Sequence, residues 1–237
     1  MSIGNALDDK QIAHLIETLG REISRPENKP LAEKLSLLVK VADTQIEQIF
    51  TINQPDNEPE ETTLSSYGNF VSEPLLEYGV KKSPRIFGKH TVYENGEAIG
   101  MQDFDFRKNV SLGTNAMLAL GGLILKKLEK GGLVVFDELD NSLHPKISRF
   151  FIQLFHNPDI NKGNAQIVFS THEPLLMDKD MFRSDQIWFT EKNKFGESEL
   201  YSAQDFDGVR EDIPFDKWYM AGKFGALPNI QESLFSF

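Results

Sequence analysis

The stretch LVVFDELDNSLHP, residues 133–145, runs an apolar segment directly into the carboxylates of Asp137, Glu138 and Asp140 and then reaches His144. A short uninterrupted apolar run is typical of a strand that is buried on both faces of a parallel sheet. A carboxylate just beyond such a strand loses hydration, and a cation or a dense hydrogen-bond network must compensate it. The stretch therefore predicts a strand end whose carboxylates are compensated by a cation or by a hydrogen-bond network.

A second strand ends in the same way. AQIVFSTHEP, residues 165–174, is apolar until Ser170, and the helical spacing of residues 144–156 separates it from the first strand. A strand–helix–strand order gives a right-handed crossover and a parallel sheet, in which the carboxyl ends of the strands meet at one edge. We therefore expect His172 to emerge close to Glu138. QIWFT, residues 186–190, is predicted to be a third strand.

A helix is predicted upstream over SLGTNAMLALGGLILKKLEKGG, residues 111–132, and the glycine pair ends it. Ser111 has the character of an N-cap, and Gly113 would let an anion approach the N–H groups at the positive end of the helix dipole. Capping alone also explains Ser111. The glycine and the threonine after it are the reason to propose phosphate binding there.

The N-terminal part of the chain has a different pattern. Apolar residues recur at helical spacing over residues 8–24 and again over 31–49, which predicts a helical hairpin. Two β-rich runs then meet at Asn95-Gly96, the strongest short-range signal for a β-hairpin because both residues tolerate positive φ.

These elements predict an α/β fold with three parts. Residues 1–52 form the helical hairpin, residues 53–84 form an acidic flexible linker rich in proline and small polar residues, and residues 85–237 form a parallel-sheet core preceded by the β-hairpin.

Composition excludes several classes of protein. The 25 basic and 36 acidic residues give a net charge of −11, so the surface as a whole repels nucleic-acid backbones and anionic membranes. Cysteine is absent, which excludes disulfides and thiolate metal sites. The opening residues, MSIGNALDDKQIAHL, lack the pattern of a secretory signal, and no apolar run of about 18 residues occurs. We expect a cytoplasmic protein without a membrane segment.

The strand ends also fit nucleotide hydrolysis. In phosphoryl transfer, a strand-end aspartate commonly holds Mg²⁺ and a neighbouring carboxylate orients the attacking water or accepts its proton. Asp137 would then serve the metal and Glu138 the water. A neutral imidazole at His172 can donate a hydrogen bond to a γ-phosphate.

Four motifs, in order, resemble those of ABC-type ATPases. Ser-Leu-Gly-Thr at the start of a helix resembles the signature motif, and LVVFDE resembles the Walker B strand. LDNSLHP resembles the D-loop, and FSTHEP resembles the segment that carries the switch histidine. The resemblance extends to the prokaryotic AAA-domain ATPases that are related to SMC-like DNA-repair proteins and occur in abortive-infection and other anti-phage systems. WYMAGKFGALPN, residues 218–229, is similar to the C-terminal end of that family.

The resemblance implies a P-loop NTPase-like core, ATP and Mg²⁺ as cofactors, and a dimer of nucleotide-binding domains. It makes Asp137 the Mg²⁺ ligand, Glu138 the catalytic base and His172 the γ-phosphate sensor. Asp140 becomes a D-loop residue that faces a partner. Ser111 and Gly113 become signature residues that close over a nucleotide held by the opposing subunit. The family also implies a role in phage defence with an effector nuclease encoded nearby; DNA is a further partner, although the charge does not indicate it.

One part of the family pattern is missing. The sequence contains no G-x-x-x-x-G-K-[ST] phosphate loop, since its two Gly-Lys pairs, at Gly88 and Gly222, continue with His and Phe. We expect the chain to correspond to the C-terminal half of a nucleotide-binding domain and to require the loop from another polypeptide.

Two alternatives stay open. The chain could be an interaction module that keeps the fold while its chemistry is idle. Asp137, Glu138 and Asp140 could instead form a two-metal nuclease site, although adjacent residues on an extended strand end point in different directions.

Overall fold

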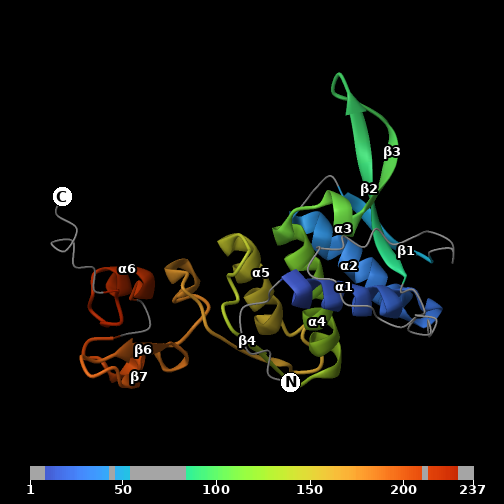
Figure 1. The fold of residues 1–237 in the computed structure, drawn as a ribbon. Helices are drawn as coiled ribbons and strands as arrows, with labels where there is room; N and C mark the ends of the chain where they lie inside the picture. Colours follow the sequence, from blue (N-terminus) through green and yellow to red (C-terminus); the bar gives the residue numbers. More distant parts are fainter. Residues whose placement is uncertain (1–8, 43–45, 54–83, 210–212, 229–237) are drawn as a thin grey trace, which may run out of the picture. The chain divides into compact units, whose positions relative to one another are not determined.

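The computed structural model describes residues 9–42, 46–53, 84–209 and 213–228 (Figure 1). These residues fall into two compact units, residues 9–126 and residues 127–228, and the boundary lies within helix α4, Leu112–Lys130. The acidic linker predicted over residues 53–84 lies, except for its two end residues, outside the described part of the chain.

The first unit begins with the two predicted helices, α1 (Asp9–Ile23) and α2 (Lys29–Ala42), which are joined by a 3-10 turn, η1 (Pro26–Asn28). The helical spacing of α1 places Ile12, Ile16 and Leu19 on one buried face. The helical hairpin that the sequence predicts is therefore present as far as Ala42.

The prediction of helix over residues 31–49 is wrong beyond that point. Residues Ile46–Ile52 form strand β1, which pairs antiparallel with β2 (Arg85–Glu94). Ile46 and Ile49 are buried, and their i, i+3 spacing is compatible with a helix when read from the sequence alone. The β-branched side chains of IEQIFTI favour a strand once a partner strand is available.

Strand β2 continues into the predicted hairpin with β3 (Glu97–Asp105). Asn95 and Gly96 take φ values of 52° and 87°, the left-handed conformation that a two-residue turn requires. Because β1 pairs only with residues 85–90 of β2, the far half of the hairpin is a two-stranded ribbon that extends beyond β1 (Figure 1). A short helix, α3 (Phe106–Asn109), follows β3 and leads to α4.

The end of α4 agrees with the sequence prediction. Gly131 adopts a φ of 85° and its N–H donates to the Lys127 carbonyl at 2.7 Å, which closes the helix. A side chain at Gly163 would meet the Gly131 backbone nitrogen at 2.2 Å. Glycine at both positions therefore allows the loop before β5 to approach the end of α4.

The second unit contains the predicted strand–helix–strand arrangement. Strand β4 (Leu133–Phe136) pairs in parallel with β5 (Gln166–Phe169), and α5 (Pro145–His156) connects them. The expected burial of both faces is wrong, because Leu133 and Val168 are exposed while Val134 and Phe136 are buried. The face that carries Val134 and Phe136 is the more deeply buried face of this sheet.

The third predicted strand does not join that sheet. Strand β6 (Trp188–Lys192) pairs antiparallel with β7 (Ser198–Ser202) across a tight turn at Gly196. The connection from β6 to β7 is too short for a crossover, so these two neighbouring strands pair antiparallel. Helix α6 (Phe215–Met220) completes this part of the chain. This part of the chain contains an aromatic core. Its buried members are Ile187, Phe189, Ala203, Ile213, Phe215 and Phe224.

Candidate functional site

The carboxyl ends of β4 and β5 form the candidate site. Phe136 is paired with Phe169 in the parallel register, and the Ser170 N–H donates to the Phe136 carbonyl at 3.0 Å. The next residues of the two strands, Asp137 and Ser170, therefore leave the sheet side by side. This is the juxtaposition that the strand–helix–strand order predicts.

The Ser170 hydroxyl connects the two loops. Its Oγ donates to Oδ1 of Asp137 at 2.5 Å and accepts from the Glu138 N–H at 2.8 Å. The Ser170 carbonyl accepts from the Leu139 N–H at 3.0 Å. One serine thus fixes the Asp137 carboxylate and the backbone on which Glu138 is carried.

Glu138 has a left-handed backbone, with a φ of 53°. Such a conformation is uncommon for a residue other than glycine, and it is often found at functional sites, where surrounding contacts hold it in place. Here the contacts to Ser170 hold it. The turn directs the Glu138 carboxylate to the β5 side, where Oε1 lies 3.2 Å from Nε2 of His172.

His172 stands well into solvent. Its side chain is 83% exposed, whereas that of Glu138 is 38% exposed. The structure thus places His172 beside Glu138, as the topology leads us to expect, and leaves most of the imidazole accessible. An exposed ring that is anchored at one nitrogen can still bind a ligand with the rest of its surface.

Asp140 and Thr171 form a second connection between the loops. The Thr171 hydroxyl donates to Oδ1 of Asp140 at 2.5 Å and accepts from the Glu173 N–H at 3.0 Å. Sequence reasoning did not single out Ser170 or Thr171. The available signal was their position, since both directly follow strand β5 and have short hydroxyl side chains.

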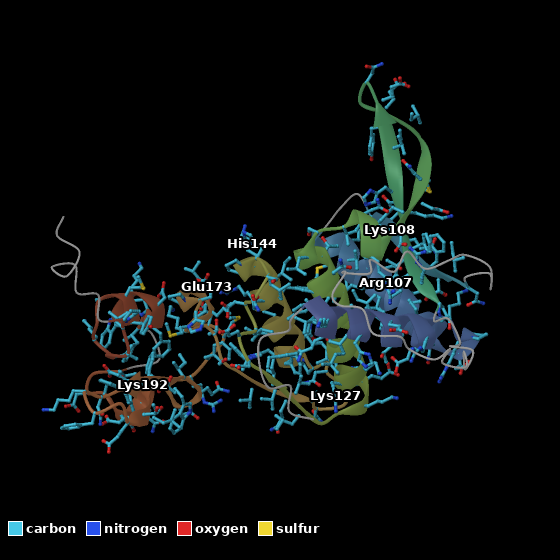
Figure 2. The ribbon with its side chains drawn as sticks, viewed as in Figure 1. Arg107, Lys108, Lys127, His144, Glu173 and Lys192 are labelled. Atoms are coloured by element: carbon cyan, nitrogen blue, oxygen red, sulfur yellow. The ribbon has the colours of Figure 1, made fainter. Side chains whose placement is uncertain are left out.

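Beyond these connections, His144 and Glu173 cap the segments that leave the site (Figure 2). Nδ1 of His144 accepts from the Lys146 N–H at 3.2 Å at the start of α5. Glu173 accepts from the Leu175 N–H at 3.0 Å and begins the 3-10 turn η2 (Pro174–Leu176). Both contacts fix backbone geometry close to the strand ends.

Ser111 and Gly113 lie in the other unit, at the first turn of α4. The Ser111 hydroxyl accepts from the Thr114 N–H at 3.1 Å and lies 2.9 Å from the Thr114 hydroxyl. Ser111 is therefore the predicted N-cap. Its approach to the strand-end residues stays a prediction.

The donor set at the strand ends fits Mg²⁺. Asp137 and Asp140 supply hard carboxylate oxygens, and Mg²⁺ sites in nucleotide enzymes typically use one or two carboxylates together with phosphate oxygens and water. In the described part of the chain, no cluster of three or more metal-ligating side chains occurs. A metal at Asp137 would therefore take most of its ligands from a bound triphosphate.

Among the described residues, the carboxylates of the site have His172 as a neighbour but no lysine or arginine. Within the described ranges, no Lys or Arg forms an ion pair with any of the four acidic residues at the strand ends. These residues are Asp137, Glu138, Asp140 and Glu173. The strand ends thus present uncompensated negative charge, which attracts a cation.

Comparison with known families identifies the chain. Residues 31–178 match the model of a family described as AAA domain, putative AbiEii toxin, Type IV TA system. The match covers more than half of the 237 residues and includes both strand ends and the first turn of α4. This chain belongs to that AAA-domain family. It therefore carries a nucleotide-binding domain of the ATPase type, in a family that generally uses ATP and Mg²⁺.

The match ends before β6, so the similarity of residues 218–229 to the family's C-terminal end stays a prediction. No curated protein matches the chain. Among the helices of the described segments, none combines the length and apolar character needed to span a bilayer.

Proposed function

We propose that this AAA-domain chain supplies the hydrolytic half of a Mg²⁺-dependent ATP site, whose phosphate-binding loop comes from outside these 237 residues. The observation that carries the proposal is the meeting of Asp137, Glu138 and His172 at one edge of a parallel sheet, fixed by the Ser170 hydroxyl. In open α/β sheets, ligands bind outside the carboxyl ends of the strands.

Asp137 would hold the metal. A bound Mg²⁺ neutralises charge on the β- and γ-phosphate oxygens as the bond to the leaving group breaks. Ser170 keeps the Asp137 carboxylate in one orientation by donating to Oδ1. The other oxygen then remains available to the ion.

Glu138 would orient the attacking water and accept its proton. Oε1 already has a hydrogen-bonding partner in His172 at 3.2 Å, so the carboxylate is held near the imidazole. The exposed His172 ring would contact the γ-phosphate. Its contact with Glu138 would link the position of that carboxylate to the bound phosphate. The contact with His172 holds the Glu138 carboxylate in place, and a general base must lie within hydrogen-bonding distance of the water whose proton it accepts.

The remaining predicted residues would act across an interface. Ser111 and Gly113, at the N-terminus of α4, would close over a nucleotide held by an opposing subunit, and the helix dipole would favour its phosphates. Asp140 would face the same partner. A homodimer of this sequence cannot supply the phosphate loop, because the G-x-x-x-x-G-K-[ST] pattern is absent from every copy.

The test is a reconstitution of turnover. We expect purified protein alone to release negligible phosphate from Mg-ATP, and we expect a phosphate-loop polypeptide encoded beside this chain to restore release. Glu138→Gln should reduce the restored rate by about 100-fold or more, because general acid–base catalysis contributes on that order. Ser170→Ala, which removes the two hydrogen bonds that the hydroxyl makes to Asp137 and Glu138, should lower the rate as well.

The matched control is Glu199→Gln, the same chemical change on an exposed residue of β7. It should leave the restored rate unchanged. The proposal fails if no neighbouring phosphate-loop polypeptide restores turnover, or if Glu138→Gln and Glu199→Gln behave alike.

A second candidate function is that of an idle interaction module. The absent phosphate loop favours it, because the chain alone lacks the main grip on a triphosphate. Tight binding of Mg-ATP by the isolated chain, measured by calorimetry, would contradict an idle module.

The family description names a putative AbiEii toxin of a type IV toxin–antitoxin system. We extend this to the chain as a cytoplasmic role in anti-phage defence, with an effector nuclease encoded nearby. Loss of phage resistance on Glu138→Gln in cells that carry the whole locus would support that role.

A further inference from the structure

A cavity adjoins the two segments that leave the strand-end loops. Its volume is about 360 Å³, within the range of about 300–1,000 Å³ that is common for small-molecule sites. It is lined by the N-terminal part of α5, by residues 175–179 and by the start of α6. The charged residues of the lining are Lys146, Arg149, Asp178, Lys179 and Asp216. The convergence of three cations and two carboxylates indicates a charged ligand.

One of the three cations is already neutralised. The Arg149 guanidinium donates to Oδ2 of Asp178. Oδ1 of Asp178 accepts from the Asp180 N–H at 2.7 Å. Burial alone would raise the pKa of Asp178, but these two hydrogen bonds outweigh burial and hold the pKa below its ordinary value. Asp178 therefore stays charged near neutral pH and occupies Arg149.

The two lysines remain to bind a ligand. Within the described residues, Lys146 forms no ion pair. Nζ of Lys179 lies 3.5 Å from Asp180, but both side chains are exposed, and exposed pairs of this kind contribute little. The positive end of the α5 dipole lies beside Lys146 and also favours an anion.

Two lysines fit a phosphate better than a carboxylate. A phosphate monoester carries about −1.5 to −2 charges near neutral pH, which two ammonium groups match. A carboxylate would leave one lysine without a counter-charge. Lysine binds phosphate as a point charge, whereas planar recognition of a carboxylate commonly uses the arginine fork, which Asp178 occupies here.

The rest of the cavity suits an apolar ring with polar substituents. Leu175, Met177 and two prolines provide apolar surface, and Leu175 is 62% exposed. On the α6 side, the Asp216 carboxylate has no hydrogen-bond donor among the residues that the structure describes. An ionised carboxylate only accepts hydrogen bonds, so a ligand at this position must present hydroxyl or amino groups.

We propose that this cavity binds a nucleoside monophosphate. Its phosphate lies between Lys146 and Lys179, its ring contacts Leu175, and its hydroxyl or amino groups donate to Asp216. This site is separate from the carboxylates at the strand ends, and it does not depend on the ATP hydrolysis proposed above.

Two hydrogen bonds connect the cavity with the strand-end loops. The Lys146 N–H donates to Nδ1 of His144, and the Leu175 N–H donates to the Glu173 carboxylate; both acceptors are labelled in Figure 2. Each donor belongs to a residue that lines the cavity. A ligand that immobilises Lys146 and Leu175 therefore also stabilises these two caps and the loops that they end.

The test is a calorimetric titration of the whole chain with AMP. EDTA removes Mg²⁺, which the proposed strand-end site requires, and no phosphate-loop polypeptide is added. We expect Lys146→Gln to bind AMP at least about tenfold more weakly, because a hydrogen bond to a charged group is worth that much. Lys192→Gln is the control, the same change at an exposed lysine of β6, and it should bind as the wild type does.

The thermal midpoints of the wild type and both variants should agree, because Lys146 and Lys192 are exposed. No binding of AMP by the wild type would overturn the site. Equal binding by the two lysine variants would overturn it as well.

Two further ligands separate the phosphate from the ring. Adenosine should not bind, because it lacks the phosphate, and inorganic phosphate should bind more weakly than AMP. Asp216→Asn should weaken the binding of AMP, but it should leave the binding of inorganic phosphate unchanged or stronger, because it removes a negative charge. Equal affinities of the wild type for phosphate and AMP would assign the cavity to free phosphate and overturn the nucleotide.

Hydrogen exchange tests the connection with the loops. AMP should slow exchange of the Leu175 N–H in the wild type and not in Lys146→Gln. Unchanged exchange in the wild type with AMP bound would overturn the connection. None of these measurements depends on phosphate release, so the cavity can fail while the proposed ATP hydrolysis stands, and the reverse.

Discussion

Residues 137–140 and 170–173 hold one another through hydroxyl and carboxylate groups that remain accessible to solvent, whereas β6, β7 and α6 enclose an aromatic core around Phe224. Phe224 is 1% exposed, and its ring centroid lies 5.0 Å from that of Phe189 and 5.3 Å from that of Phe206. The first region consists of polar contacts worth about 1 kcal/mol each. The second consists of buried aromatic surface, which contributes several times more per residue.

Within one unit of the chain, the residues proposed to act in hydrolysis are therefore different from the residues that stabilise the fold. The strand-end site lies inside the part that matches the AAA-domain family, and the aromatic core lies outside it. Substitutions in the core should therefore lower the free energy of unfolding. Substitutions at the strand ends should lower the rate of turnover and leave the free energy of unfolding nearly unchanged or slightly raised.

The largest effect is expected in the aromatic core. Phe224→Ala should lower the free energy of unfolding by about 3–5 kcal/mol, because it removes a buried ring and leaves a cavity. Urea unfolding followed by circular dichroism measures this. Phe195→Ala is the control, since that ring is 77% exposed and its loss should change stability by less than about 0.5 kcal/mol. Similar losses for both variants would show that the core does not carry the stability of this region.

A smaller effect of opposite sign is expected at the strand end. Glu138→Gly should raise the free energy of unfolding by roughly 0.5–1 kcal/mol. Glycine adopts a left-handed backbone without the cost of about 1–2 kcal/mol that other residues have. The greater flexibility of glycine in the unfolded chain offsets part of this gain. Reconstituted turnover should disappear at the same time.

Ser142→Gly provides the matched comparison for this prediction. Ser142 is exposed and has a φ of 61°, so the same substitution should give a similar gain in stability. We expect it to retain turnover. A loss of stability in Glu138→Gly would mean that the carboxylate contributes more to folding than its backbone costs.

A further effect concerns alkaline pH. Burial, and then a hydrogen bond to Glu191, raise the pKa of Tyr201 to about 12 from an ordinary value near 10. A pKa that is raised in the folded state means that the protonated phenol contributes stability below pH 10, which is lost as pH rises from about 10 to about 12. Absorbance of tyrosinate and unfolding at a series of pH values should show this loss. In Tyr201→Phe it should be smaller, and an unchanged loss would assign it to other groups.

The sequence predicts the elements whose signal is local. Helix α4 follows from its periodicity and terminal glycines, the hairpin from Asn95-Gly96, and the parallel pair from apolar runs separated by a helix. The proximity of Glu138 and His172 then follows from topology, because parallel strands end at the same edge.

The remaining features depend on tertiary partners. The sequence predicts helix at β1 because the spacing of Ile46 and Ile49 is compatible with a helix as well as with a strand. The pairing with β2 decides in favour of the strand. The apolar character of β6 predicts a strand but does not specify that β7 is its partner. The role of Ser170 follows only from the structure, because a serine after a strand can have many roles. Its hydrogen bonds to Asp137 and Glu138 identify the role that it has here.

The Asn95-Gly96 turn has a practical consequence for experiments on this chain. The residues that flank this turn, Glu94 and Glu97, are exposed, whereas Gly96 itself has a φ of 87° that other residues adopt only with strain. Exposed loop tips of this kind accept foreign peptides without disturbing the elements that they connect. A fluorophore or an affinity handle could therefore be introduced there, so that assembly can be followed by a reporter which leaves the carboxylates and the aromatic residues untouched.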